Sequence, residues 1–396
     1  MKLSFCAIVK DEETTLPDCL NSVKDVVDEM VVLDTGSTDN TVAVAESLGA
    51  KVHRYQWNND FAAARNESLK YVQGDWVLVL DADEQLVPAI APKLKQAIET
   101  DDYIAINLLR QEVGAAQSPY SMVSRLFRHH PEIRFSRPYH ALVDDSIDAL
   151  RQRETHWKIG SLGEVAILHE GYRADAIARG NKLARAQAAM EAFLKDHPGD
   201  PYTCSKLGAL YVQTGKCQKG VRLLSQGLSA SAGDPGLTYE LHYHLGIACS
   251  RLNNSEQAII HYQTATQQAV LPRLKLGAYN NLGSLLKAKG NLLAAKQAYQ
   301  EVMQIDSNFA IGHYNLGTTL KAMGDLPNAI AAYRRAIALN PDYAEAYQNL
   351  GLALLKAGQI QESLKALKRA IALHQRTNPI EAQRLHQGLK EMGFSV

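Results

Sequence analysis

Two aspartates that could bind a metal ion follow an apolar stretch of the chain. Asp81 and Asp83 stand directly after Val77–Leu80, with one alanine between them. Such a stretch predicts a buried strand, so both carboxylates should lie at its end. Carboxylate oxygens are the ligands that the hard cations Mg²⁺ and Mn²⁺ prefer. The pair therefore indicates a divalent cation that bridges a diphosphate group.

Polar residues also follow two earlier apolar segments. Lys10–Glu13 come after Leu3–Val9, and Asp34–Thr41 come after Glu29–Leu33. The second group combines a carboxylate, a glycine turn and a Ser/Thr helix cap, which together can hydrogen-bond a ribose or a base edge. Neither GxGxxG nor the P-loop pattern GxxxxGK occurs, so a classical dinucleotide site and a P-loop are excluded.

Predicted strands and helices alternate along residues 1–110, and these elements must position the polar residues. Strands are predicted at Leu3–Val9, Glu29–Leu33, Lys51–Arg54, Trp76–Leu80 and Tyr103–Leu108, and helices at Leu16–Val27, Thr41–Leu48, Phe61–Val72 and Pro88–Glu99. This alternation predicts an α/β domain with a mostly parallel sheet and helices on both faces. Ligands of such sheets bind at the carboxyl ends of the strands, which is where the polar residues fall.

The second half of the chain is repetitive. The dipeptide Leu-Gly recurs at 207–208, 245–246, 282–283, 316–317 and 350–351, with spacings of 38, 37, 34 and 34 residues. A small residue follows each glycine after twelve positions, and a large one follows after sixteen: Leu224, Tyr262, Tyr299, Tyr333 and Leu367. Small residues let two helices approach and the large one fills the groove beside them. The pattern therefore predicts stacked helix–turn–helix units.

Charge divides the chain of 396 residues into two unlike halves. Lys and Arg total 42, as do Asp and Glu, but residues 1–200 hold 22 basic and 31 acidic side chains whereas residues 201–396 hold 20 and 11. All three tryptophans lie in the acidic half, which indicates separate cores, and the length predicts two to three domains. The acidic half suits a divalent cation. The basic half suits an acidic partner or docking on its own neighbour.

Several protein classes are excluded by the sequence. The longest apolar runs fall far short of the roughly 20 residues of a membrane-spanning helix, so no integral membrane segment is expected. The N-terminal residues have no signal cleavage site and should form the first strand. The five cysteines are dispersed and have no CxxC spacing, which favours a cytoplasmic protein over a disulfide-bonded or zinc-binding one. We expect no nucleic-acid partner.

Four segments, in order, carry a family resemblance: Ile8–Glu13, Asp34–Asp39, Ala64–Asn66 and Asp81–Asp83. Together they resemble the family 2 glycosyltransferases of the GT-A fold, over about residues 1–172. The resemblance implies an inverting transfer from a nucleoside-diphosphate sugar, usually a UDP-sugar, with Mn²⁺ or Mg²⁺ as cofactor. It implies a nucleoside pocket lined by Val9, Glu12, Asp34, Asp60 and Arg65, with Asp81 on the ribose or sugar and Asp83 on the metal. The alternative for each acidic residue is a solvated side chain or a helix cap.

The acceptor side departs from the family pattern. Where related transferases carry a histidine–glutamate pair, this chain has His140 and Ala141. An inverting mechanism needs a carboxylate or an imidazole within hydrogen-bond reach of the acceptor nucleophile. The candidates for this base are His140, Asp144 and Asp145.

A later segment, Ala166–Tyr172, resembles the family's late histidine motif. The resemblance implies that His169 is a metal ligand or completes the diphosphate site. The alternative is a histidine with a structural role only.

The repeats resemble the tetratricopeptide repeat over about residues 201–378. This resemblance implies an all-α solenoid of five repeats. A linking helix is expected from Asp175 to about Asp196, within residues 173–200, and a capping helix is expected within residues 379–396. Such solenoids are surfaces for interaction and carry no chemistry of their own.

An asparagine precedes three of the Leu-Gly pairs, at Asn281, Asn315 and Asn349. The position lies on the first helix of each repeat, which lines the concave face. Amides can donate to and accept from a peptide backbone, so the row resembles the asparagine ladder of the protein O-GlcNAc transferases. Roughly the same face carries Lys287, Lys321 and Lys356. The alternative is that these asparagines only supply local polarity.

The sequence therefore predicts a cytoplasmic, metal-dependent glycosyltransferase that acts on a protein or peptide held by the repeats. Two alternatives stay open. In one, the repeats form a homodimer and the acceptor is a small molecule or a glycan. In the other, the transferase domain has lost its activity and the protein is a scaffold; Ala141 favours this alternative, and the intact Asp81 and Asp83 pair with Arg65 argues against it.

Overall fold

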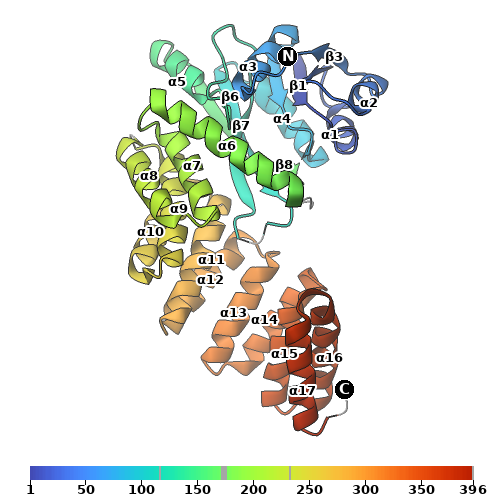
Figure 1. The fold of residues 1–396 in the computed structure, drawn as a ribbon, viewed down its shortest axis with the longest axis vertical. Coiled ribbons are helices and arrows are strands. Elements are labelled where there is room, and N and C mark those ends of the chain that lie inside the picture. The colour runs from blue at the N-terminus through green and yellow to red at the C-terminus, as the bar shows by residue number, and fades with distance from the viewer. Residues whose placement is uncertain (116, 171–175, 232, 395–396) are drawn as a thin grey trace. The chain divides into compact units, whose positions relative to one another are not determined.

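The computed structural model describes residues 1–115, 117–170, 176–231 and 233–394, and for residues 176–182 it describes the backbone alone. The chain divides into two compact units, residues 1–232 and residues 233–396. The first unit contains the α/β domain and the first three helices that follow it, and the second contains the remaining helices (Figure 1). The expected fold class, an α/β domain followed by an all-α repeat region, is confirmed.

An eight-stranded sheet forms the centre of the first unit, in the order β3-β2-β1-β4-β7-β6-β8-β5. The strands are β1 (Leu3–Val9), β2 (Glu29–Asp34), β3 (Lys51–Arg54), β4 (Trp76–Val79), β5 (Glu84–Leu86), β6 (Tyr103–Glu112), β7 (Tyr120–Arg128) and β8 (Lys158–His169). The pairs β1/β2, β2/β3, β1/β4 and β6/β8 are parallel. The pairs β4/β7, β6/β7 and β5/β8 are antiparallel.

The sheet is thus mixed, whereas the sequence predicted a mostly parallel one. The difference arises at β7, which lies between β4 and β6 and runs antiparallel to both. A short connection joins β6 to β7, and strands joined in this way pair antiparallel. The direction of β6 and β8 still matches that of β4, so the carboxyl ends of these three strands meet at the same edge of the sheet.

Helices cover both faces of the sheet, as predicted. They are α1 (Leu16–Val23), α2 (Thr41–Ser47), α3 (Phe61–Ser68), α4 (Ala91–Ile98) and α5 (Asp144–Arg153), with 3-10 turns at Leu69–Tyr71 and Pro88–Ile90. One core joins Leu20 of α1 and Leu94 of α4 to Leu78 of β4. The other joins Ile147 of α5 to Val77 and Val79, on the opposite side of the same strand.

Three further helices belong to the first unit: α6 (Ala176–Asp196), α7 (Pro201–Gln213) and α8 (Cys217–Ala230). Asp175, where the linking helix was expected to begin, lies outside the described residues, as do residues 171–174. Met190 of α6 and Leu207 of α7 share a small buried cluster, and Tyr139 of the α/β domain packs against it. The loop that carries Tyr139 is therefore in contact with the helices that begin the repeat region.

The second unit consists of paired helices (Figure 1). They are α9 (Pro235–Arg251), α10 (Ser255–Gln267), α11 (Leu276–Ala288), α12 (Leu292–Ile305), α13 (Ala310–Ala322), α14 (Leu326–Leu339), α15 (Ala344–Lys356), α16 (Ile360–Thr377) and α17 (Pro379–Glu391), with a 3-10 turn at Pro272–Lys275. The packing predicted from the Leu-Gly spacing is confirmed. A Cβ atom added at Gly246 would lie 2.6 Å from the ring of Tyr262, sixteen residues later. The same relation joins Gly317 to Tyr333 at 2.8 Å, so the glycines permit the close approach of each helix pair.

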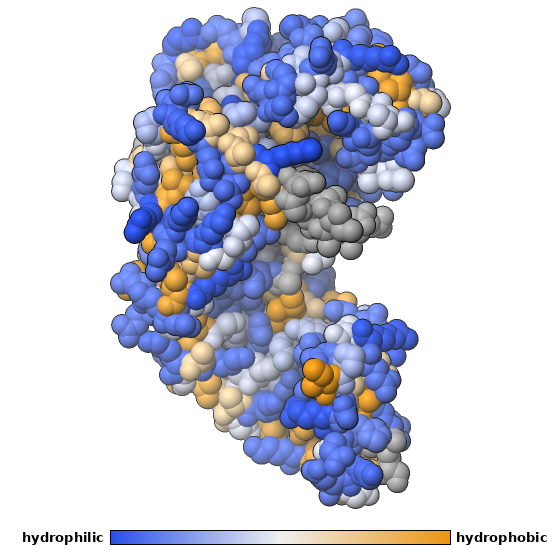
Figure 2. Space-filling view, in the orientation of Figure 1, coloured by the Kyte–Doolittle hydropathy of each residue, from blue (hydrophilic) through white to orange (hydrophobic). Residues whose placement is uncertain are grey.

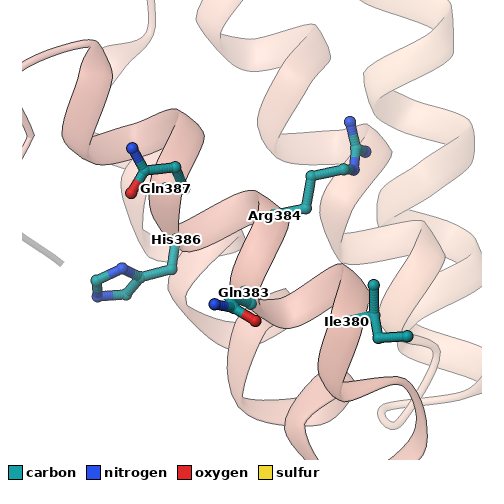
Figure 3. A pocket seen from close by; sticks show the side chains of 5 residues that line it. All are labelled: Ile380, Gln383, Arg384, His386 and Gln387. Carbon is teal, nitrogen blue, oxygen red and sulfur yellow. The ribbon is translucent and has the colours of Figure 1, made fainter.

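Hydrophilic side chains cover much of the surface in view, with smaller hydrophobic areas between them (Figure 2). Within the described ranges, no helix is both long enough and apolar enough to cross a membrane. A pocket on α17 is lined by Ile380, Gln383, Arg384, His386 and Gln387 (Figure 3). These residues are in the second unit, whereas the carboxylates singled out from the sequence are in the first.

Candidate active site

Two arginines hold the carboxylate of Asp81, which follows β4. Nη2 of Arg65, on α3, donates to Oδ1 of Asp81, and Nη2 of Arg125, on β7, donates to Oδ2 at 2.9 Å. Burial raises the pKa of Asp81, but the charges of Arg125 and Arg65 outweigh it and hold the pKa well below its usual range. Asp81 is therefore a carboxylate at neutral pH, in a fixed orientation.

Each of these two arginines also has a second terminal nitrogen, Nη1, that makes no hydrogen bond among the described residues. Nη1 of Arg65 and Nη1 of Arg125 are buried, and neither has a hydrogen-bond partner among the described residues. Only 7% of the Arg65 side chain is exposed, and its guanidinium lies over the ring of Phe135. Buried donors without partners are costly and call for an explanation. Two cationic N–H groups beside Asp81 can bind an anion such as a diphosphate.

A buried glutamate fixes the backbone at Asp81. Glu84 begins β5 and is fully buried. Its Oε2 accepts from the backbone N–H of Asp81 at 2.9 Å, and its Oε1 accepts from Nη1 of Arg110 at 2.7 Å. Nη2 of Arg110 lies 2.8 Å from Oε1 of Glu112, at the end of β6. Arg110 therefore joins two carboxylates beneath the edge of the sheet.

His169 closes this network at the end of β8. The strand register places Glu112 opposite His169 on one side and Glu84 opposite it on the other. Nδ1 of His169 lies 2.5 Å from Oε2 of Glu112, and Nε2 lies 3.3 Å from Oδ2 of Asp83. Burial lowers the pKa of His169, but the hydrogen bonds to Asp83 and Glu112 outweigh it and raise the pKa to about 10.

Asp83 and His169 form the pair of side chains that could hold a divalent cation. No group of three or more His, Cys, Asp or Glu side chains that could hold a metal ion occurs in the part of the chain that the structure describes. Asp81 does not fit as a ligand, because arginines occupy both of its carboxylate oxygens. Mg²⁺ is commonly bound through one or two carboxylates, with water and substrate phosphates completing the shell. Asp83 at the sheet edge supplies such a carboxylate, and His169 could join it as a second ligand, with the cation displacing the proton that the raised pKa keeps on the ring.

Three of the residues expected around the nucleoside, Val9, Glu12 and Asp34, lie at or just after the ends of the first two strands. Val9 and Asp34 are paired in register, and both are almost completely buried. The carbonyl of Val9 accepts from the backbone N–H and the hydroxyl of Thr35, each at 2.9 Å, and Oδ1 of Asp34 accepts from the N–H of Ser37 at 3.0 Å. Glu12 donates its N–H to the hydroxyl of Thr41 at 2.7 Å. These contacts fix the loops after β1 and β2 to each other.

Asp60 is the N-cap of α3. Its Oδ1 accepts from the N–H of Ala63 at 3.0 Å, which is the capping role named as an alternative to ligand binding. The cap sets the start of the helix that carries Arg65. Asp60 thus affects the arginine site through the helix, whatever its second carboxylate oxygen binds.

The three candidate bases have different surroundings. Asp144, in the first turn of α5, accepts from the hydroxyl of Ser124 at 2.7 Å, and burial raises the pKa of its carboxyl group. Asp145 is more exposed and forms an ion pair with Arg137 at 2.5 Å. His140 is exposed, has a φ of +53°, and packs edge-on against Tyr139.

The segment that contains His140 is attached on two sides. Nη2 of Arg137 pairs with Oδ2 of Asp200 at 2.7 Å, and Asp200 is also the N-cap of α7. The carbonyl of Pro138 accepts from the N–H of Phe61 at 3.1 Å, at the start of α3. The loop that carries His140 is therefore held between α3, which carries Arg65, and α7.

The three expected ladder asparagines lie on α11, α13 and α15, and each is half-buried. Their amides donate within the repeats. Nδ2 of Asn281 donates to the hydroxyl of Tyr262 at 3.3 Å, and Nδ2 of Asn349 donates to the hydroxyl of Tyr314 at 3.2 Å. Nδ2 of Asn315 donates to Oδ1 of Asn280 at 2.9 Å. Part of their hydrogen-bonding capacity thus holds neighbouring helices together.

Sequence reasoning assigned no role to Glu84, Arg110, Glu112 or Arg125. A signal was present, because Arg110 and Arg125 interrupt strands that are otherwise rich in apolar residues. A charged side chain in such a strand must find a partner when the sheet folds. The identity of the partner depends on the strand order, which local spacing does not reveal.

Comparison with known proteins finds a family match in each of the two parts of the chain. A model of the glycosyl transferase family 2 matches residues 4–160. Tetratricopeptide repeat models match residues 276–309, 319–358 and 344–380. A TPR repeat-containing protein of Synechococcus elongatus is 45% identical over 302 residues, which are 76% of this chain and 75% of that protein.

Two further relatives are named as glycosyltransferases. A protein of Rickettsia conorii, named as an uncharacterized glycosyltransferase, is 31% identical over 179 residues, which are 43% of this chain and 63% of that protein. Glycosyltransferase SunS of Bacillus phage SPbeta is 29% identical over 140 residues, which are 34% of this chain and 32% of SunS. The chain therefore spans less than two thirds of each of these relatives. Among solved structures, MamA is 24% identical with a TM-score of 0.38, over 43% of this chain and 96% of MamA.

Proposed function

The chain belongs to the family 2 glycosyl transferases with tetratricopeptide repeats, and we propose that it transfers a sugar, with inversion, from a UDP-sugar to a polypeptide held by the repeats. The observation that carries the donor side is the pair of buried, unpartnered Nη1 atoms of Arg65 and Arg125. A diphosphate would supply the acceptors that these two donors need. Asp81 holds both guanidinium groups in place for it.

In this proposal, Asp83 and His169 are the protein ligands of the divalent cation. Mn²⁺ or Mg²⁺ bound there would stabilise the negative charge that develops on the departing diphosphate. The chain's own contribution is orientation, because Glu112 contacts Nδ1 of His169 and leaves Nε2 directed at Asp83. Ligands that are fixed before binding lose little freedom when the cation arrives.

Asp144 takes the role of base in this proposal. Its raised pKa brings it nearer to the range in which a base works efficiently at neutral pH. Ser124, its hydrogen-bond partner, precedes Arg125 on β7, so Asp144 and Asp81 are attached to adjacent positions of one strand. Asp145 is less suited, because its Oδ2 is already engaged in the ion pair with Arg137. His140 is the second candidate.

A polypeptide acceptor is favoured by the repeats, since such solenoids are interaction surfaces. The two other readings of the sequence make different predictions. A homodimer with a small-molecule or glycan acceptor requires association through the repeats. An inactive scaffold requires that no UDP-sugar is turned over.

Calorimetric titration of UDP-sugars, with and without Mn²⁺, tests the donor side. The wild-type chain should bind at least one UDP-sugar and bind it more tightly with the metal. Replacing both arginines, in Arg65→Ala with Arg125→Ala, should weaken UDP binding by at least tenfold. The matched control is Arg151→Ala with Arg153→Ala on α5, two exposed arginines in surface ion pairs, which should leave the affinity unchanged. Equal losses in the two variants, or no UDP-sugar binding by the wild type, would overturn the proposal.

A further inference from the structure

Three lysines form a row across successive repeats of the second unit, which we call the lysine row: Lys287 on α11, Lys321 on α13 and Lys356 on α15. These three helices contact one another in order. Nζ of Lys287 donates to the hydroxyl of Thr318 on α13 at 2.8 Å, and Nζ of Lys321 donates to Oδ1 of Asn349 on α15 at 2.5 Å. The lysine row therefore lies along one face, each of the first two members reaching toward the next repeat.

No carboxylate neutralises the lysine row within the ranges that the structure describes. Some other basic residues of this unit have acidic partners: Lys289 pairs with Glu256, and Arg334 pairs with Glu362. The partners of Lys287 and Lys321 are neutral oxygen atoms instead. Both side chains are half-buried, while Lys356 is exposed. Three like charges thus share a partly desolvated face, which raises the energy of the protein on its own.

The pKa values reflect the same arrangement. Burial and the neighbouring charge of Lys321 lower the pKa of Lys287. Burial and the neighbouring charge of Lys356 lower the pKa of Lys321. The lysines are therefore close enough to repel one another, and an anionic group placed between them would be attracted by more than one.

We propose that the lysine row binds an acidic segment of a polypeptide, whose carboxylates lie between successive lysines. This rests on the proposed function, in which the repeats hold the acceptor, and it specifies the charge of that acceptor. The ladder asparagines precede the lysines by six or seven residues on the same helices. Amide side chains recognise the amides of a polypeptide backbone, which a nucleic acid lacks. The combination of amides and lysines therefore favours an acidic polypeptide over a nucleic acid.

Fluorescence anisotropy with labelled peptides tests the lysine row directly. The probes are an oligoglutamate and an oligoglutamine of equal length, titrated with the full chain. The wild type should bind oligoglutamate at least tenfold more tightly, and added salt should weaken that binding. The variant Lys287→Gln with Lys321→Gln and Lys356→Gln should lose at least tenfold in affinity for oligoglutamate.

The matched control removes three lysines from the second helices of the repeats: Lys296→Gln, Lys365→Gln and Lys368→Gln. It makes the same change in net charge and should bind the peptide within about twofold of the wild type. The single variant Lys356→Gln, at an exposed position, keeps the test valid should the triple variant not fold. Equal losses in the triple variant and its control would show a general effect of charge and would overturn the proposal.

Two further outcomes would also overturn it. Tight binding of single-stranded DNA that is lost in the same triple variant would assign the row to a nucleic acid. A change of oligomeric state in that variant would assign it to contacts between copies of this chain. UDP binding, measured separately by calorimetry, reports on the transferase site. A chain that binds UDP but not oligoglutamate would retain the proposed function and lose only the inference about the acidic acceptor.

Discussion

Nε2 of His169 faces Oδ2 of Asp83 at 3.3 Å, although 86 residues separate them in the chain. The two side chains come from different strand ends, and the register of β8 with β6 and β5 sets the position of the histidine. Glu112 contacts the other ring nitrogen at 2.5 Å. The sheet therefore positions His169, and Asp83 lies in the short turn directly before β5, so both side chains are attached close to regular structure, as a precise ligand site requires.

Replacing Asp83 by asparagine should reduce sugar transfer by several orders of magnitude. The change keeps the size of the side chain but removes the charge that would hold the cation at the departing diphosphate. The side chain of Asp83 is 31% exposed, so the substitution should have only a small effect on folding. Transfer rates and thermal unfolding should be measured together, with the exposed Asp148→Asn as control. Near-normal transfer by the wild type in excess EDTA would contradict a role for the metal.

Glu112→Gln should weaken Mn²⁺ binding by about 10- to 100-fold, the usual effect of losing a side chain that orients a ligand. Glutamine keeps the shape, but its neutral amide oxygen accepts from Nδ1 of His169 less strongly than a carboxylate does. Calorimetric titration with Mn²⁺ in the presence of UDP measures the effect without reference to turnover. Glu132→Gln, in a surface ion pair, is the control. An unchanged Mn²⁺ affinity in Glu112→Gln would remove His169 from the metal site.

The repeat region was largely predictable from the sequence because its rules are local. The spacing of sixteen residues between Gly317 and Tyr333 encodes one contact within one helix pair, and the structure contains it. The sheet was predictable only where strands and helices alternate. The antiparallel strand β7 was missed, since its place between β4 and β6 depends on pairing between distant segments.

In the candidate site, too, the features that depend on local sequence were predicted and those that depend on contacts between distant segments were not. Asp81, Asp83 and His169 were found because each directly follows or ends an apolar strand or belongs to a known motif. The side chains that hold these three residues in place were not predicted from the sequence. Arg110 joins Glu84 of β5 to Glu112 of β6. The spacing of two residues places Arg110 and Glu112 on one face of their strand, but nothing in the spacing places Glu84 beside them. Buried ion pairs of this kind are specified by the fold as a whole.

The pH profile of transfer should distinguish Asp144 from the other candidate bases. A base must be deprotonated, and burial raises the pKa of Asp144 above the ordinary value, so the acidic limb of kcat/KM should lie above pH about 4. The hydroxyl of Ser124 stabilises the charged form, so Ser124→Ala should raise this pKa further and move the limb to higher pH. Ser136→Ala, beside Asp145, is the matched control and should leave the limb in place. A shift in the control alone would assign the base to Asp145.

Replacing the three asparagines Asn281, Asn315 and Asn349 by alanine should weaken transfer to a polypeptide acceptor by at least tenfold. Each lost hydrogen bond to the acceptor contributes on the order of 1 kcal/mol, and three such losses exceed the 1.4 kcal/mol that corresponds to a factor of ten. Hydrolysis of the donor in water does not involve the repeats, so it should be retained. Both rates can be measured with the same UDP-sugar.

The structure adds a necessary control, because two of these amides also donate to tyrosine hydroxyl groups within the repeats. Tyr262→Phe with Tyr314→Phe removes those internal hydrogen bonds and leaves the asparagines in place. If the asparagines hold the acceptor, the phenylalanine variant should lower the melting temperature slightly but keep most of the transfer activity. Equal losses of transfer in both variants would show that the asparagines act by holding the helices together. A change of oligomeric state in the alanine variant would instead support a dimer formed through the repeats, with an acceptor bound elsewhere.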